Sequence, residues 1–194
     1  MKGALIAVAV AVVLVGIWGV SSNNSLVKLD QGVKQSWSQV ENVYQRRMDL
    51  IPNLVETVKG VSSFERETYT AVSDARARAG SIQITSELLN DPQKFQQFEA
   101  AQNQLSGSLS RLLVTSEKYP ELKANQSFEN LQAELAGTEN RIAVERRRFN
   151  ETVGAYNVEV NSFPTRIIAG MLGYREKPYF TAAAGASQVP QVKF

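Results

Sequence analysis

The longest apolar segment of the chain lies at its N-terminus, where residues 3–20 form a run of 18 uncharged residues. As a helix with a rise of about 1.5 Å per residue, this run would be roughly 27 Å long. That length is just enough to cross the hydrocarbon core of a bilayer, which is about 30 Å thick. Trp18 lies near the outer end of the run, where an indole ring can rest at the lipid–water interface. The pattern predicts one transmembrane anchor over residues 3–20.

A cleaved signal peptide is the competing interpretation of this segment. Lys2 precedes the apolar run, and Val-Ser-Ser at residues 20–22 would serve as a cleavage site. The run is longer than the apolar region of a signal peptide, usually about 7–15 residues, which favours a retained anchor. Charge says little about orientation, because Lys2 on one side is opposed by Lys28 and Lys34 on the other.

Beyond the anchor, apolar residues recur at spacings of three and four, which is the pattern of an amphipathic helix. The first stripe keeps its phase across Pro52, so we expect a helix that is kinked there, or two helices with Asp49 capping the second. The helical pattern then continues to about Ala79, with Gly80 as its stop and residues 81–90 as a loop. The stripe consists of Leu26, Leu29, Val33, Trp37, Val40, Tyr44, Arg47, Ile51, Leu54, Val58 and Val61.

Two further stripes predict two more long helices. The first begins at the capping pair Asp91-Pro92 and ends at Pro120, and the second begins at Asn125 or Ser127 and ends at Pro164. The first stripe contains Phe95, Phe98, Gln102, Leu105, Leu109, Leu112, Ser116 and Tyr119. The second contains Phe128, Leu131, Leu135, Thr138, Ile142, Glu145, Phe149, Val153, Tyr156, Val160 and Phe163.

These elements predict an all-α fold, an elongated antiparallel bundle of three long helices, or four if the first is broken, with an N-terminal transmembrane helix. The bundle spans residues 25–164. Residues 165–180 form an amphipathic segment that folds back on the bundle, lies at a membrane interface or docks on a neighbouring subunit. Residues 181–194 are rich in Ala, Gly, Ser, Gln and Val and are expected to be a flexible tail.

Composition excludes several kinds of chemistry. The chain has no cysteine and no histidine, so thiolate nucleophiles, disulfides, zinc sites built on those residues and the usual base near neutral pH are absent. The acidic residues are dispersed, which argues against a Ca²⁺ or Mg²⁺ site. The net charge of +2 gives no reason to expect nucleic acid as a partner, and the basic run 146–148 is expected to be a solvated helix face. We therefore expect no cofactor and no enzymatic activity.

Several segments of the chain resemble the LemA family of bacterial membrane proteins. They are RRMDLIPNLVETVKG at 46–60, EKYPELKAN at 117–125, TENRIA at 138–143, Phe149-Asn150, Tyr156-Asn157, Phe163-Pro164 and Tyr179-Phe180. The resemblance covers about residues 23–180 and follows the family order. It implies an N-terminal membrane segment and an elongated helical bundle, and it implies no established catalytic activity.

The chain departs from part of this family at residues 20–23. Relatives in some Gram-negative bacteria carry a lipid-attachment cysteine after a short apolar segment, whereas this chain has Val-Ser-Ser-Asn there. A lipoprotein anchor is therefore excluded. Because such relatives would be exported, the resemblance favours a single-pass protein of the bacterial inner (plasma) membrane with its bundle on the periplasmic or extracytoplasmic side, the cytoplasmic side being the alternative.

The polar residues within these segments are the candidate site. In the structural interpretation, Asp49 and Asn53 satisfy amides freed by Pro52, and Arg46 or Arg47 pairs with a carboxylate such as Glu139 or Glu117. The alternative is a site for a ligand or partner. The asparagines at 140, 150 and 157 either fix helix register or form a ladder between copies. The candidates are Arg46, Arg47, Asp49, Pro52, Asn53, Glu117, Tyr119, Pro120, Asn125, Glu139, Asn140, Arg141, Asn150, Tyr156 and Asn157.

Together these features predict a non-enzymatic, membrane-anchored helical scaffold or interaction protein that self-assembles into a membrane-attached oligomer. Its predicted partners are the membrane and further copies of itself. One alternative is an adaptor for a membrane protease, another envelope protein or a stress system. The other is a protein that binds lipid or cell-wall material in a cleft lined by Arg46, Arg47 and the asparagines.

Overall fold

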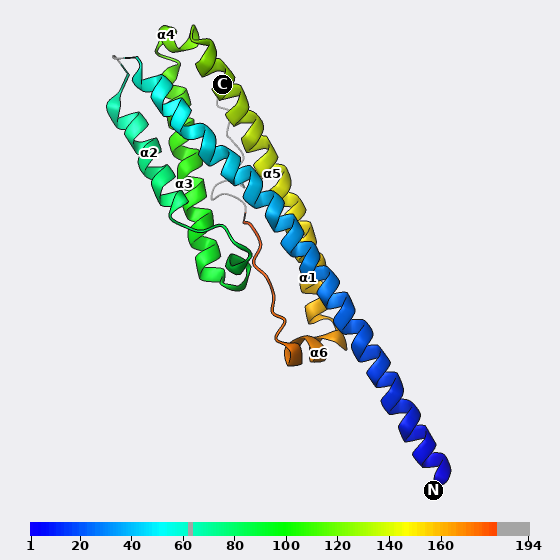
Figure 1. Cartoon of the computed structure of the whole chain (residues 1–194). Coiled ribbons are helices and arrows are strands. Elements are labelled where there is room, and N and C mark those ends of the chain that lie inside the picture. Colours follow the sequence, from blue (N-terminus) through cyan, green and yellow to red (C-terminus); the bar gives the residue numbers. More distant parts are fainter. Residues whose placement is uncertain (62–63, 182–194) are drawn as a thin grey trace, which may run out of the picture.

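The computed structural model describes residues 1–61 and 64–181, and within them all regular structure is helical and no strand is present. The long helices α1 (Lys2–Lys59), α2 (Arg66–Gly80), α3 (Pro92–Ser116) and α5 (Gln126–Asn161) form an elongated antiparallel bundle (Figure 1). Shorter elements are the 3₁₀ turn η1 (Ser86–Asn90), α4 (Pro120–Lys123) and α6 (Thr165–Leu172). The predicted all-α bundle with a long apolar N-terminal helix is confirmed.

Helix α1 continues through Pro52 without a break. A proline has no N–H to donate to the carbonyl four residues earlier, which here belongs to Met48. Arg76 of α2 donates its Nε to that carbonyl at 3.0 Å instead. The neighbouring helix therefore satisfies the group that proline leaves open. The alternative of two helices meeting at Pro52 is wrong. The first helix instead ends at Lys59, and the next begins at Arg66.

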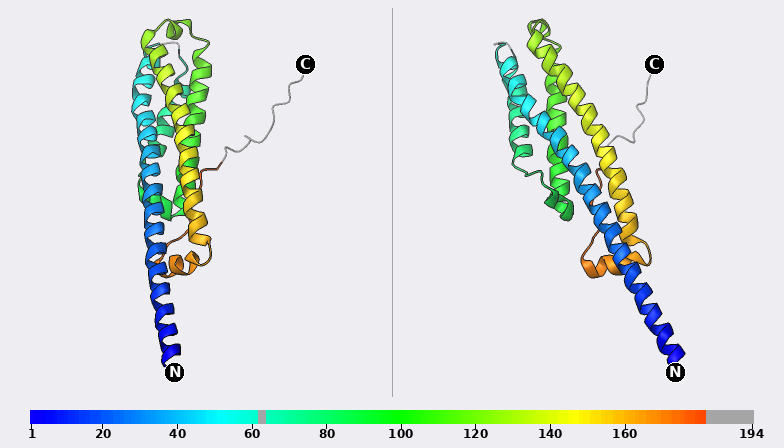
Figure 2. Two further views of the ribbon diagram at one scale, coloured as in Figure 1. Left: turned by 90° about the vertical axis from the view of Figure 1, so that its right-hand side faces the viewer. Right: turned by 45° about the vertical axis from the view of Figure 1, so that its right-hand side comes forward.

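The first part of α1 extends beyond the bundle (Figure 2). Residues 1–17 are all exposed, and α1 is long and apolar enough over this part to cross a membrane. From Leu26 onward the same helix is buried along one side. A single element therefore joins the apolar segment to the core of the bundle.

The predicted starts of α3 and α5 are confirmed by their caps. Asp91 accepts hydrogen bonds from the backbone N–H groups of residues 93 and 94, both at 3.1 Å. Asn125 accepts from the N–H groups of residues 127 and 128 at 2.9 and 3.2 Å. Each cap satisfies amides that have no partner within the helix. The loop expected over residues 81–90 contains η1.

The predicted stripes form the core, which is divided into two hydrophobic clusters. The cluster nearer the apolar segment contains Trp37, Tyr44, Phe95, Phe98 and Phe149 among others. The cluster at the far end contains Ile51, Leu54, Leu105, Leu112 and Phe128 among others. Phe163, expected at the end of the last stripe, is instead 83% exposed because α5 ends at Asn161.

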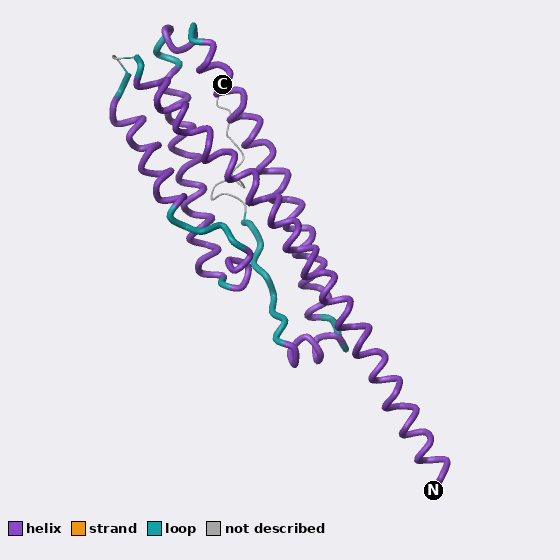
Figure 3. The backbone as a smooth tube through the Cα atoms, viewed as in Figure 1, coloured by secondary structure: helices purple, strands orange, loops and turns teal. Residues whose placement is uncertain are grey.

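The amphipathic segment expected over 165–180 consists of a short helix, α6, followed by a non-helical stretch. Helix α6 ends at Leu172 and is capped by Gly173, whose φ of +79° lies in the left-handed region that favours glycine. Residues 174–181, which we call the strap, are non-helical and run back along the bundle (Figure 3). The tail expected over 181–194 lies outside the described residues beyond Thr181.

Candidate functional site

The first polar centre of the bundle is the buried guanidinium of Arg47, which is only 1% exposed. Its Nη1 donates to Ser106 Oγ and to Glu139 Oε1, both at 2.7 Å, and its Nη2 donates to Gln102 Oε1. The Tyr44 ring lies beneath the guanidinium carbon, 5.0 Å from ring centroid to carbon. Two helices, α3 and α5, thus supply hydrogen-bond partners to one charge on α1, which fixes how the three helices align.

This centre forms a polar layer between the two hydrophobic clusters. Arg47, Gln102 and Thr138 are all buried, and each stands on a stripe that is mostly apolar. The buried atoms Arg47 Nε, Gln102 Nε2 and Trp37 Nε1 have no hydrogen-bond partner in the described part of the chain. A polar group buried without a partner lowers stability, so the layer gives alignment at some expense of stability.

Two other charged candidate residues, Arg46 and Glu117, lie on the surface. Arg46 pairs with Glu134 at 2.5 Å, and Glu117 pairs with Lys123. Of the two carboxylates predicted to receive an arginine, Glu139 does so and Glu117 does not. The surface pairs are exposed and contribute little to stability.

The polar residues around Pro52 do not have the predicted role. Asp49 accepts a hydrogen bond from Gln45 Nε2 at 2.8 Å, and the carbonyl of Asn53 accepts from Thr57 Oγ1 at 2.8 Å. Because α1 is unbroken there, these residues cap no helix.

The second polar centre is a pair of asparagines on α5 that holds the strap. Asn157 donates to the carbonyl of Lys177 and accepts from its N–H, both at 2.9 Å. Asn150 makes the same two bonds with Phe180, also at 2.9 Å. Each amide side chain therefore pairs with one backbone residue as a neighbouring β-strand would.

The spacing of these two contacts explains why asparagines seven apart can hold an extended chain. Seven residues of helix rise about 10.5 Å. Three residues of extended chain span about 10 Å. Asn150 and Asn157 are seven apart and their partners, Phe180 and Lys177, are three apart in the opposite direction. The strap is therefore antiparallel to α5 and in register with it.

The end of the strap is inserted into the core. Phe180 is 5% exposed, and the guanidinium carbon of Arg146 lies 4.5 Å from its ring centroid. Arg146 also pairs with Glu99 at 2.7 Å, and Glu99 accepts from the N–H and Oγ1 of Thr181, both at 3.0 Å. The basic run was expected to be solvated, which is wrong for Arg146. The ring of Phe180 packs among Trp37, Phe95, Phe98 and Phe149.

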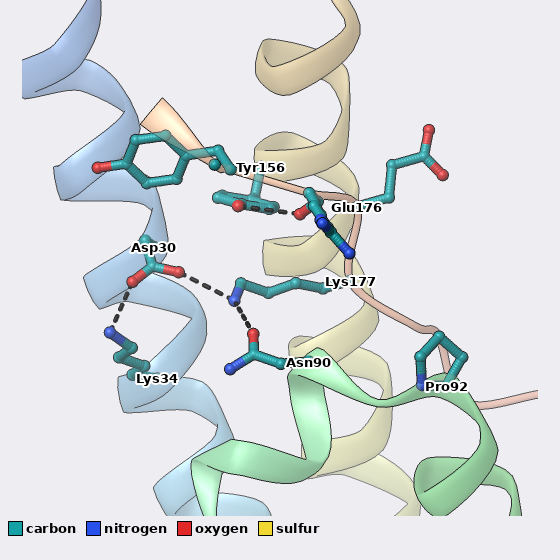
Figure 4. A pocket seen from close by; sticks show the side chains of 10 residues that line it. Asp30, Lys34, Asn90, Pro92, Tyr156, Glu176 and Lys177 are labelled. Atoms are coloured by element: carbon teal, nitrogen blue, oxygen red, sulfur yellow. Dashed lines mark hydrogen bonds and ion pairs between the residues drawn. The ribbon is translucent and has the colours of Figure 1, made fainter. Parts of the chain in front are cut away.

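Lys177 connects the strap to the opposite side of the bundle (Figure 4). Its side chain is buried, and its Nζ lies 3.0 Å from Asp30 Oδ1 on α1 and 3.5 Å from Asn90 Oδ1 on η1. The Tyr156 ring centroid is 5.1 Å from the same nitrogen. One strap residue thus joins α1, η1 and α5.

The electrostatics of this contact favour the charged pair. Burial raises the pKa of Asp30, but hydrogen bonds from Lys34 and Lys177 outweigh it and hold the pKa below its ordinary value. Burial, together with the Asp30 charge, raises the pKa of Tyr156 to about 12, and its hydroxyl donates to the carbonyl of Arg175 at 3.0 Å. A pocket of about 560 Å³ lies beside these groups.

The remaining predicted site residues are scattered. Asn140 and Arg141 are exposed on α5. Tyr119 packs on Phe64 with ring centroids 4.8 Å apart, Pro120 begins α4 and Asn125 caps α5. Within residues 1–61 and 64–181, no group of three acidic side chains could hold a metal ion.

Several residues of the two polar centres were not predicted from the sequence. For the buried layer a signal was present, because Arg47, Gln102 and Thr138 interrupt three apolar stripes. Lys177 and Glu99 gave no such signal, since their partners are distant in sequence.

A model of the LemA family matches residues 36–194. The chain belongs to the LemA family. No curated protein matches the sequence. The family match begins within the buried part of α1 and takes in Arg47 with its partners, both asparagines, α6 and the strap, whereas Asp30, the partner of Lys177, lies before the matched region. LemA is a membrane-associated family, and the apolar start of α1 is compatible with membrane anchoring.

Proposed function

We propose that this LemA-family protein is a non-catalytic scaffold, anchored in the bacterial plasma membrane by α1, whose bundle works by interaction and self-assembly. The observation that carries the proposal is the continuity of α1, which runs as one helix from the apolar segment into the bundle core. A rigid connection of this kind holds a folded body at a fixed place on a membrane. Such a rigid connection suits assembly with neighbouring copies better than a flexible tether, which would let the domain diffuse freely, would do.

The use of the motif residues supports a structural role. Arg47 and Asn157 are buried, and their bonds go to Glu139, Gln102 and the strap. Catalytic groups need access to a substrate in a cleft. The burial of Arg47 and Asn157 counts against these two residues as the lining of a ligand cleft.

The apolar segment offers a face for self-assembly. Residues 1–17 are exposed on all sides of α1. Gly3, Ala7 and Ala11 are spaced by four and share one side of the helix. Small residues at this spacing let membrane helices approach closely. Copies of the chain would then stand side by side with their bundles parallel.

Light scattering of the full chain in mild detergent tests self-assembly, with Ala7→Leu as the variant. We expect oligomers whose apparent dissociation constant rises about tenfold in Ala7→Leu, because a larger side chain separates the helices. Ala9→Leu is the matched control on the opposite side and should leave the constant unchanged. A monomer across a wide concentration range would refute the assembly proposal.

The side of the membrane is tested by protease protection in intact cells and in spheroplasts. We expect digestion of the bundle once the outer barriers are opened, as the exported members of the family suggest. Protection until the inner membrane is lysed would instead place the bundle in the cytoplasm. That outcome would favour the adaptor alternative, which predicts a membrane protease co-purifying at defined stoichiometry.

A further inference from the structure

Helix α6 lies across the end of the bundle from which α1 continues alone (Figures 1 and 2). Thr165 and Ala169 on its inner side are buried. Ala169 belongs to the hydrophobic cluster nearer the apolar segment, the aromatic cluster around Trp37. A helix turns about 100° per residue, so Ile167 and Met171 project from the opposite side. That side faces away from the bundle, in the direction in which the apolar segment extends.

This outward side is apolar and unusually exposed. Met171 is 81% exposed, Ile167 55% and Leu172 54%, and Phe163 just before the helix is 83% exposed. A helix that lies on a soluble bundle normally turns its polar side outward. In α6 the pattern is reversed, since the side turned away from the bundle is the hydrophobic one. An exposed apolar surface of this kind marks a contact with a membrane or with another protein.

The position of α6 along α1 indicates what covers this surface. Gly19, Val20 and Asn23 of α1 form an apolar recess of about 300 Å³ with Ile168, Met171 and Leu172. A Cβ placed on Gly19 would lie 3.6 Å from Ile168 Cδ1. Helix α6 therefore meets α1 where the apolar run 3–20 ends. In a membrane spanned by that run, this level is the boundary between lipid tails and headgroups.

We propose that α6 is an in-plane membrane helix that inserts Phe163, Ile167 and Met171 at the surface of the bilayer, and that it forms a second contact with lipid beside the anchor. The occupant is phospholipid rather than a second protein, because the exposed apolar side is continuous with the apolar segment of α1. The inference rests on the proposed anchoring by that segment.

Charge around α6 fits a phospholipid surface. Arg166 on α6, Arg175 just after it and Lys28 on α1 are exposed beyond the apolar boundary, alongside the exposed carboxylate of Glu176. Basic side chains at this level can reach lipid phosphates while their apolar stems remain near the interface. The sequence of α6 itself, TRIIAGML, contains no acidic residue.

The absence of cysteine allows a direct test with single labelled cysteines in the full chain. Met171→Cys would carry an environment-sensitive fluorophore in vesicles of phosphatidylcholine and phosphatidylglycerol, with Ile167→Cys as a second position if the first variant loses helix content. Nitroxide-labelled lipid and aqueous iodide serve as quenchers. Val12→Cys in the apolar run reports anchoring, and Val114→Cys, 70% exposed on α3, is the solvent control.

We expect lipid nitroxide to quench labels at positions 12 and 171 at least severalfold more than the label at 114, and iodide to quench mainly position 114. Quenching at 12 but not at 171 would overturn the in-plane helix and leave the anchor intact. No lipid quenching at 12 would overturn both. A label at 171 that is shielded from iodide but not quenched by lipid would show a protein occupant, and would also overturn the proposal.

Discussion

Arg47 and its partners show how a bundle fixes alignment with a charge. Its guanidinium bonds to α3 and α5 at one level, whereas apolar packing alone tolerates sliding by one turn. Replacing any partner leaves a buried donor short of an acceptor. The layer is therefore sensitive to substitutions that would be neutral on the surface.

We expect Gln102→Leu to lower the free energy of unfolding by about 1–2 kcal/mol, because Arg47 Nη2 loses its acceptor. The loss stays in the lower part of the usual range since the unpaired Gln102 Nε2 is removed as well. Urea unfolding of the full chain in detergent measures the difference. Gln104→Leu, exposed on the same helix, should change the value by less than about 0.5 kcal/mol, and an equal effect of both substitutions would refute the role of the layer.

Asp30 provides a pH-dependent contribution at the residue scale. Its pKa is lowered from the ordinary 3.8 in the folded state, so its stabilisation is present above that value and is lost as pH falls through the lowered pKa. Asp30→Asn should therefore reduce Tm near neutral pH, and the difference from the unchanged protein should shrink in strong acid. Circular dichroism melts across acidic pH measure this. Asp74→Asn, exposed on α2, is the control, and a difference that does not vary with pH would contradict the assignment.

At the scale of elements, the strap completes a core that the four long helices leave open. Phe180 fills the space between Trp37, Phe95 and Phe149, so the aromatic cluster depends on a segment that is not helical. Asn150 and Asn157 give this segment the backbone partners that a sheet would supply. The sequence predicted that the asparagines either fix helix register or form a ladder between copies. Asn150 and Asn157 do neither, because they bond to the backbone of the strap within one copy.

We expect Asn157→Ala to lower the free energy of unfolding by about 2 kcal/mol, since two hydrogen bonds to Lys177 are lost. Amide hydrogen exchange at residues 175–181 should become faster while exchange in α3 is unchanged. Asn140→Ala, exposed on the same helix, should have neither effect. Unchanged protection of the strap in Asn157→Ala would show that the amide ladder does not hold it.

Periodicity and caps predicted α3 and α5 well, because the stripes and the capping residues Asp91 and Asn125 are local signals. Two features were beyond such signals. The phase of the stripe predicted that the helix continues across Pro52, but not that Arg76 of α2 bonds the freed carbonyl of Met48. The strap depends on a match between helical and extended spacing that exists only after α5 and residues 177–180 are brought together.

For the molecule as a whole, the unbroken α1 is the element that would couple the bundle to the membrane in the proposed anchoring. We expect Asn24→Pro to loosen this coupling, because proline interrupts the helix between apolar segment and bundle. A fluorophore at Val114→Cys in vesicles should show faster decay of anisotropy, while Tm of the bundle stays nearly unchanged. Asn24→Ala is the control, and identical anisotropy in both variants would argue that α1 is not the coupling element.

With α1 anchored as proposed, its continuity would also make the protein a lever whose fulcrum lies at the bilayer surface. Residues 21–59 form an arm of about 58 Å. Transmembrane helices change their tilt to match bilayer thickness, over a range of about 40°. A tilt change of about 10° would move the far end of the arm sideways by about 10 Å. A small change in lipid thickness would thus become a displacement wide enough for a neighbouring molecule to detect.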